Sequence, residues 1–276
     1  MEPDIELVII NSPNRDALGM LARGEVSALL EKIENEKQHG APQTQERSAL
    51  QYFADFYHQY KDDRRSIRPP DLTWDLPFSF SIELVRVLYA MRAGQEPREL
   101  VSAFAARTLS TTTRVADLIQ EKARASQEGS PIEADIWMAG ASLREWVQLL
   151  ADYFQLESDL RSETEARYQK AKVTSAIMAN HPHVCAPDLV STAKCLERLR
   201  EVSQARSFYS AVVSDMLSVA HECNAQPSPP NDEHVLVLQS LLEACEGLKR
   251  IESPSQSRHH QSKIDEITAV LNRRKN

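Results

Sequence analysis

Histidine and cysteine are the residue types in this chain best suited to chemistry, because they ligate metal ions and act as bases or nucleophiles. His181, His183 and Cys185 are spaced two residues apart, and Cys195 follows further along the chain. These four side chains could in principle supply the ligands of a zinc ion. Their spacing matches no standard zinc module, so the favoured interpretation is a surface turn followed by a buried cysteine.

Other patterns that carry catalysis do not provide a site either. The sequence holds no glycine-rich phosphate loop and no HExxH, GxSxG or DxDxDG pattern. We expect Glu163 and Glu165 to be solvated charges near Arg161 and Arg167, and not an acid–base pair. The pair His259-His260 is expected to lie in a polar linker. The sequence therefore predicts no catalytic residue, no metal site and no cofactor. We expect a protein that is not an enzyme.

The run Thr108 to Thr113 is rich in hydroxyl groups. It could be a phosphorylation target. The favoured interpretation is a helical stretch or a kink in which the hydroxyls bond to their own backbone.

These side chains must be positioned by helices, because apolar residues recur at helical spacing along most of the chain. The expected helices cover 16–37, 45–61, 81–93, 98–125, 131–180 with a bend near Ser158, 187–223, 232–251 and 263–271. Ile5 to Ile10 is rich in Val and Ile and is the one good strand candidate. We expect residues 1–14 to be extended and residues 226–231 and 253–262 to be loops.

The predicted fold class is therefore all-α. We expect a single domain over residues 1–276 of stacked antiparallel helices, similar to a tetratricopeptide solenoid without its signature, with a short N-terminal β segment. Only 7 of the 276 residues are glycine, which disfavours a fold of many strands and tight turns.

Charge and cysteine usage limit the partners and the compartment. The formal net charge is −8, which disfavours nucleic acid or anionic lipid as the main partner. The 4 cysteines form no CxxC pair and suit reduced thiols. The Met1-Glu2-Pro3-Asp4 start has no signal sequence, and no apolar stretch could span a bilayer. We therefore expect a cytoplasmic protein that reaches membranes only through its partners.

Four segments follow one another in an order found in a known helical family. They are Leu50-Gln51-Tyr52-Phe53-Ala54-Asp55-Phe56-Tyr57; Leu72-Thr73-Trp74-Asp75 followed by Ser79, Ser81, Glu83 and Val87-Leu88-Tyr89; Met138-Ala139-Gly140-Ala141-Ser142-Leu143; and Pro187-Asp188-Leu189 leading to Val202-Ser203-Gln204-Ala205-Arg206-Ser207-Phe208-Tyr209. Over roughly residues 5 to 220 this order resembles the Bro domain of the Alix family. The chain departs from the family at Tyr89-Ala90-Met91-Arg92-Ala93, which stands in place of the family's LFNIAALYSQ core.

The resemblance implies a curved helical scaffold of the endosomal-sorting (ESCRT) pathway that binds the C-terminal amphipathic helix of an ESCRT-III subunit. Phe208 is the position that matches the family's contacting aromatic residue, and Val212 and Met216 would be exposed on the same face. Phe208 could equally be an ordinary core aromatic. The resemblance also implies association with endosomes.

The expected function is that of a scaffold or adaptor that binds an amphipathic helix or a peptide of a partner protein. The alternative is a generic helical adaptor, of tetratricopeptide or 14-3-3-like type, for an acidic or phosphorylated peptide. This alternative requires Arg and Lys side chains from several helices to converge on one groove. An enzyme that uses the scattered His and Cys residues is the third hypothesis.

Overall fold

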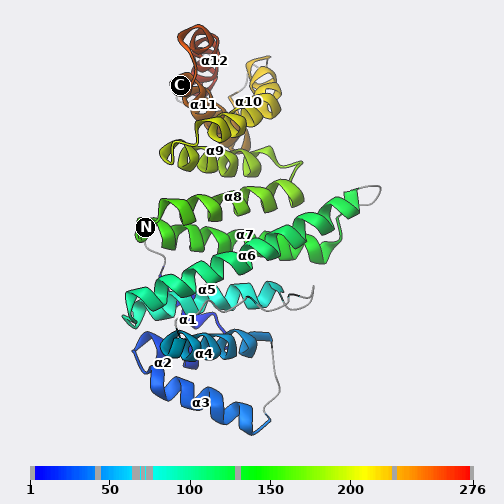
Figure 1. Cartoon of the computed structure of the whole chain (residues 1–276). Coiled ribbons are helices and arrows are strands. Elements are labelled where there is room, and N and C mark those ends of the chain that lie inside the picture. The colour runs from blue at the N-terminus through cyan, green and yellow to red at the C-terminus, as the bar shows by residue number, and fades with distance from the viewer. Residues whose placement is uncertain are drawn as a thin grey trace. The chain divides into compact units, whose positions relative to one another are not determined.

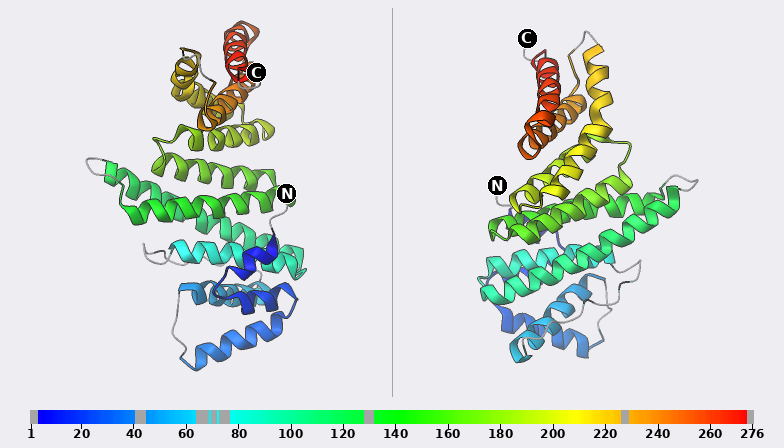
Figure 2. Two further views of the ribbon diagram at one scale, coloured as in Figure 1. Left: turned by 180° about the vertical axis from the view of Figure 1, so that it is seen from behind. Right: turned by 45° about the horizontal axis from the view of Figure 1, so that its top comes forward.

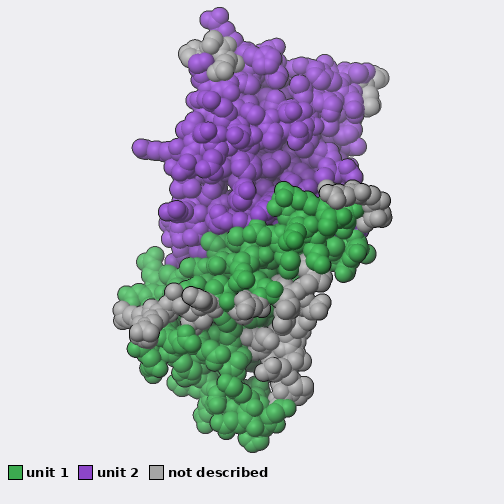
Figure 3. All heavy atoms as spheres, turned by 45° about the vertical axis from the view of Figure 1, so that its right-hand side comes forward, with its two compact units in different colours: residues 1–129, 133–152 green, residues 130–132, 153–276 purple. Residues whose placement is uncertain are grey.

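The computed structural model describes residues 4–40, 45–63, 69, 72, 77–127, 132–225 and 229–273. These residues form twelve α-helices and no strand (Figure 1), which confirms the all-α class. Contacts divide the chain, which we expected to be one domain, into two compact units (Figure 3). Unit 1 comprises residues 1–129 and 133–152, and unit 2 comprises residues 130–132 and 153–276.

Unit 1 is organised around one central helix. Its helices are α1 (Ile5–Ile10), α2 (Arg15–Ala22), α3 (Val26–Gln38), α4 (Gln45–Asp63), α5 (Pro77–Ala93), α6 (Arg98–Gln127) and most of α7 (Ala134–Leu156). Helix α5 packs against α1, α2, α4 and α6. Its residues 87–91 are all fully buried, as expected for five consecutive apolar residues that cover every side of one helical turn.

The N-terminal segment is helical, so the predicted strand at Ile5 to Ile10 and the extended conformation predicted for 1–14 are wrong over the described residues. The Asp4 carboxylate caps this helix by accepting hydrogen bonds from the backbone N–H groups of Glu6 and Leu7. A capped first turn outweighs the strand preference of Val and Ile. After α1, the hydroxyl of Ser12 donates a hydrogen bond of 3.0 Å to the buried carboxylate of Glu83 on α5.

Three predicted long helices are each broken into two by a residue with positive φ. These residues are Gly24, Ser158 and Arg200. At the last break the N–H of Arg200 donates to the carbonyl of Glu197, and the N–H of Glu201 donates to the carbonyl of Leu196. This is the Schellman arrangement that ends a helix and allows the chain to reverse direction. The predicted helices 16–37, 131–180 and 187–223 are therefore pairs of helices.

The threonine-rich run does not interrupt α6. The hydroxyls of Thr108 and Thr112 donate to the carbonyl oxygens of Phe104 and Thr108, four residues earlier in each case. This is the self-bonded helix that the sequence favoured. Thr108, Thr111 and Thr112 are fully buried, so a kinase could not reach these three side chains in the folded protein.

Unit 2 is a succession of helices, each packed on the next. They are α8 (Leu160–Ile177), α9 (Pro182–Arg198), α10 (Val202–Ala225), α11 (Asp232–Ile251) and α12 (Pro254–Asn272). Helix α9 also packs on α11, and α10 on α12; the last three helices lie side by side in both views of Figure 2. Helix α12 begins at Pro254, so the loop predicted at 253–262 is wrong.

Residues 226–228 of the predicted 226–231 loop lie outside the described residues, as do Thr73, Trp74 and Asp75 of the segment that resembles the Bro domain. Residues 229–231 are not helical, and the Asn231 side chain caps α11 by accepting from the N–H of His234. Over the described residues, no helix is both long enough and apolar enough to span a bilayer.

Candidate functional site

The residues expected to bind a partner lie on α10, and the structure places two of them in the core. Val212 is fully buried and Met216 is 6% exposed, because this side of α10 is covered by α9 and α11. The expectation that Val212 and Met216 form an exposed face is therefore wrong. Phe208 is half-buried, and its ring lies edge to face with the exposed ring of Tyr168 on α8, with 5.9 Å between the centroids.

A groove between α9 and α11 is a more complete candidate site. It has a volume of about 250 Å³. Its walls are formed by Pro187, Val190, Ser191 and Lys194 of α9 and by Leu236, Gln239, Ser240 and Glu243 of α11. Leu236 is 46% exposed, whereas Val190 at the base is buried. The groove thus combines an apolar base with hydroxyl, amide and charged groups at its rim.

Two contacts between ionisable side chains cross from α9 to α11. Lys194 Nζ lies 2.8 Å from the Glu243 carboxylate at one end of the groove. About one turn beyond the other end of the groove, His183 Nδ1 lies 3.7 Å from the carboxylate of Glu233. Residue numbers rise together along the two helices from one contact to the next, so α9 and α11 run parallel.

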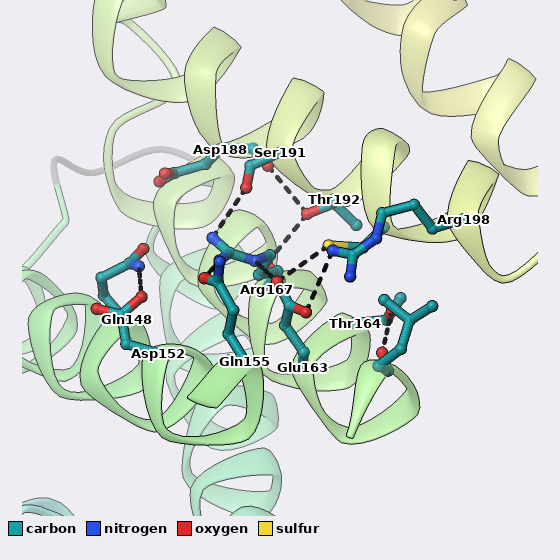
Figure 4. A network of polar contacts seen from close by, with 12 residues as sticks. Gln148, Asp152, Gln155, Glu163, Thr164, Arg167, Asp188, Ser191, Thr192 and Arg198 are labelled. Carbon is teal, nitrogen blue, oxygen red and sulfur yellow. Dashed lines mark hydrogen bonds and ion pairs between the residues drawn. The ribbon is translucent and has the colours of Figure 1, made fainter. Parts of the chain in front are cut away.

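The α9 wall is fixed from behind by a buried carboxylate on α8 (Figure 4). Glu163 is almost completely buried and accepts a hydrogen bond of 2.9 Å from Arg167 Nε. The same guanidinium donates to Ser191 Oγ at 3.0 Å and to Gln155 Oε1 at 3.1 Å. Because Ser191 also lines the groove, a contact chain runs from Glu163 through Arg167 to the groove wall.

Glu163 has two further neighbours on α9. Arg198 Nη1 lies 3.4 Å from its carboxylate, and Cys195 Sγ lies 3.5 Å from it. The expectation that Glu163 is a solvated charge is wrong, because α9 covers it. Burial, and then the negative charge of Glu163, raise the pKa of the Cys195 thiol. Both effects favour the protonated thiol, which is the less nucleophilic form.

A second buried carboxylate fixes the same pair of helices nearer the start of α9. Asp188 lies 2.7 Å from Lys170 Nζ and accepts a hydrogen bond of 2.7 Å from Thr174 Oγ1. Partners on both helices satisfy the buried polar groups, and such networks specify one register of packing. Together with Glu163, Asp188 fixes how α9 presents its outer face to α11.

A third polar cluster lies beyond the groove and joins α9, α10 and α11. Glu197 accepts two hydrogen bonds of 2.9 Å from Arg250 and one of 2.9 Å from the hydroxyl of Tyr209. Arg250 is the main cause that lowers the pKa of Glu197. Tyr209 is fully buried, and its pKa is raised by burial first and then by its hydrogen bond to Glu197. The cluster fixes the position of α11 relative to α9.

The rings of His181 and His183 lie edge to face with 5.8 Å between their centroids, but they do not converge with the cysteines on a metal site. Among the described residues, no group of three or more His, Cys, Asp or Glu side chains could hold a metal ion. Cys185 donates to the carbonyl oxygen of Met178 at 3.0 Å. His260 lies in α12, not in a linker, and its Nε2 atom is 2.8 Å from the Glu252 carboxylate.

The sequence does not predict the α9/α11 groove, because its two walls come from helices that are separated along the chain by α10. Only the placement of Leu236 on the outer face of an otherwise amphipathic α11 could have indicated it. No family model, curated protein or solved structure matches this chain.

Proposed function

We propose that this protein is a helical scaffold that binds an amphipathic helix of a partner protein in the α9/α11 groove. The observation that carries the proposal is the exposed Leu236 beside the buried Val190 in a groove with a polar rim. Grooves of this kind between helices receive the apolar face of a partner helix. The enzyme hypothesis has no comparable observation behind it.

The size of the groove supports a side-chain ligand over a small molecule. Its volume of about 250 Å³ lies below the roughly 300–1,000 Å³ typical of small-molecule pockets. One or two aliphatic side chains of a partner would fill it. The remainder of the partner helix would then lie on the rim, where Ser191 and Gln239 offer hydrogen bonds.

The rigidity of the α9 wall also supports binding. Interfaces bind more tightly when the surface is ordered beforehand, because less conformational entropy is lost on association. The buried Glu163–Arg167–Ser191 chain and the Asp188 contacts order the wall in this way.

The groove can be tested by selecting peptides against the immobilised full chain and measuring their affinity for two variants. Leu236→Glu places a charge in the groove. Leu7→Glu is the matched control, because Leu7 is 55% exposed on α1 in unit 1. We expect the selected peptides to lose affinity for Leu236→Glu and to bind Leu7→Glu like the wild type. Equal affinity for both variants, or no peptide selected, would contradict the proposal.

The resemblance to the Bro domain supports a more specific proposal, in which the stacked helices form a tetratricopeptide-like solenoid and the partner is an ESCRT-III subunit on endosomes. In this version Phe208 and the exposed Tyr168 beside it form the contact surface on α8 and α10. A pull-down with ESCRT-III tail peptides tests it. We expect Tyr168→Ala and Phe208→Asp to reduce capture, with circular dichroism as the check on folding; no capture by the wild type would exclude it.

The structure offers less support for an acidic or phosphorylated peptide. That ligand would require several unpaired cations in one groove. Lys194 is the one cation among the described residues that lines the groove, so several cations do not converge there. Arg167 and Arg198 behind the wall are paired with Glu163.

A further inference from the structure

The two walls of the α9/α11 groove carry opposite charge. At one end of the groove Lys194 of α9 faces Glu243 of α11, and about one turn beyond the other end His183 of α9 lies 3.7 Å from Glu233 of α11. The contact of Glu197 with Arg250 has the reverse polarity and, like that of His183 with Glu233, lies outside the groove lining. The charged residues that line the groove are therefore a cation on the α9 wall, Lys194, and an anion on the α11 wall, Glu243.

The charges at the rim are available to a partner. The side chains of Lys194 and Glu243 are each 47% exposed. Ion pairs with this exposure contribute little net stability, so a partner charge can compete for either member. Glu233 is more exposed still, and its contact with His183 is long.

The spacing of His183 and Lys194 along α9 indicates the length of the partner segment. His183 and Lys194 are separated along α9 by three turns, or about 16 Å at 1.5 Å per residue. A partner helix of three turns places apolar residues at i, i+3 or i+4, and i+7 over this distance. The same three turns carry charged residues on the two flanks of that apolar stripe.

From this geometry we propose that the groove selects an amphipathic helix with acidic residues on one flank of its apolar stripe and basic residues on the other. The acidic flank lies along the α9 wall and the basic flank along the α11 wall. This inference rests on the proposed function and adds the chemistry of the partner to it. A helix with the same charge on both flanks matches one wall and is repelled by the other.

Three synthetic peptides of about 18 residues, long enough to be helical alone, provide the probes. They share one leucine stripe and differ in their flanks, which are Glu and Lys, Glu and Glu, or Lys and Lys. We expect the full chain to bind the mixed-flank peptide about three- to tenfold more tightly than either of the others, since each exposed charge contact contributes a small factor. Fluorescence anisotropy measures the affinities.

A single charge reversal tests the origin of the preference. Glu243→Lys gives the groove cations on both walls, so its preference should shift to the peptide with Glu on both flanks. The matched control is Glu222→Lys on α10, an exposed glutamate outside the groove whose substitution changes the net charge by the same amount. This control should retain the preference for the mixed-flank peptide.

The possible results distinguish a failure of the charge selection from a failure of the groove as a binding site. Equal affinity for all three peptides, each weakened by Leu236→Glu, would overturn the charge selection and leave the groove as a binding site. No affinity for any peptide would overturn both. Self-association of the chain that Leu236→Glu abolishes, measured by sedimentation, would also overturn the inference, since a second copy would then be the occupant.

Discussion

The ring of Tyr209 on α10 lies directly against the backbone of Gly247 on α11. A methyl group at residue 247 would lie 2.5 Å from two ring carbons of Tyr209, closer than non-bonded carbons approach. Tyr209 cannot move aside easily, because it is fully buried and its hydroxyl is bonded to Glu197. The close approach of α10 and α11 therefore depends on the absence of a side chain at Gly247.

The first prediction concerns this contact. Gly247→Ala should lower the free energy of unfolding by about 1–3 kcal/mol through overpacking, although alanine favours helix over glycine by about 1 kcal/mol. Gly19→Ala is the matched control, because a methyl group there meets only the end of the flexible Arg23 side chain. It should be neutral or stabilising. Urea unfolding of the two variants compares them, and a Gly247→Ala variant as stable as the wild type would refute the packing account.

The second prediction concerns pH. Hydrogen bonds from Arg250 and then from Tyr209 lower the pKa of Glu197 below its ordinary value of 4.5, against the opposing effect of burial. A glutamate with a lower pKa in the folded than in the unfolded state stabilises the fold above that ordinary value, and the contribution is lost as the pH falls through the folded-state pKa.

Glu197→Gln should therefore lower the free energy of unfolding by about 1 kcal/mol at pH 7, allowing for its partial exposure. The difference from the wild type should shrink as the pH falls from 5 towards 3. Urea unfolding as a function of pH measures it, with the exposed Glu201→Gln as control. A stability difference that stays constant over this range would show that the charge of Glu197 does not contribute to the stability of the fold.

The third prediction concerns the network behind the groove. Glu163→Ala leaves Arg167 largely buried without its carboxylate, and breaking a buried pair in this way costs about 3–5 kcal/mol. Because Arg167 also bonds to Ser191, the variant should bind groove peptides more weakly even where it is still folded. The free energy of unfolding and the affinity for groove peptides are both measured on this variant. The exposed Arg161→Ala should change neither.

The fourth prediction concerns the thiols. Cys185, Cys195, Cys223 and Cys245 are all buried. Burial is the main cause that raises the pKa of Cys245 to about 11. We expect the folded protein to react slowly with a disulfide reagent at pH 8, and all 4 cysteines to react quickly in denaturant. Rapid reaction of one thiol in the folded protein would reveal local opening around that residue.

The sequence indicates the helices well, since their apolar spacing is a local property. It does not indicate where a helix ends when the residue at that end is not a typical helix-ending residue. Arg200 adopts positive φ without being glycine, so the break between α9 and α10 has no local marker. The Ile5 to Ile10 run was assigned by residue preference, whereas the Asp4 cap determines its conformation.

The site was harder to predict than the fold. Phe208, Val212 and Met216 follow one face of α10, and the sequence alone cannot tell whether that face meets solvent or a neighbouring helix. The packing of α9 and α11 buries Val212 and Met216. The groove itself depends on residues some fifty positions apart, such as Lys194 and Glu243, whose pairing leaves no periodic signal in the sequence.

The most direct test of the proposed binding site is to map where a peptide binds. A photoreactive residue placed in the leucine stripe of the mixed-flank peptide can be cross-linked to the full chain and located by mass spectrometry. Binding in the α9/α11 groove predicts cross-links within residues 187–194 and 236–243. Cross-links confined to the surface around Tyr168 and Phe208, or to unit 1, would contradict it.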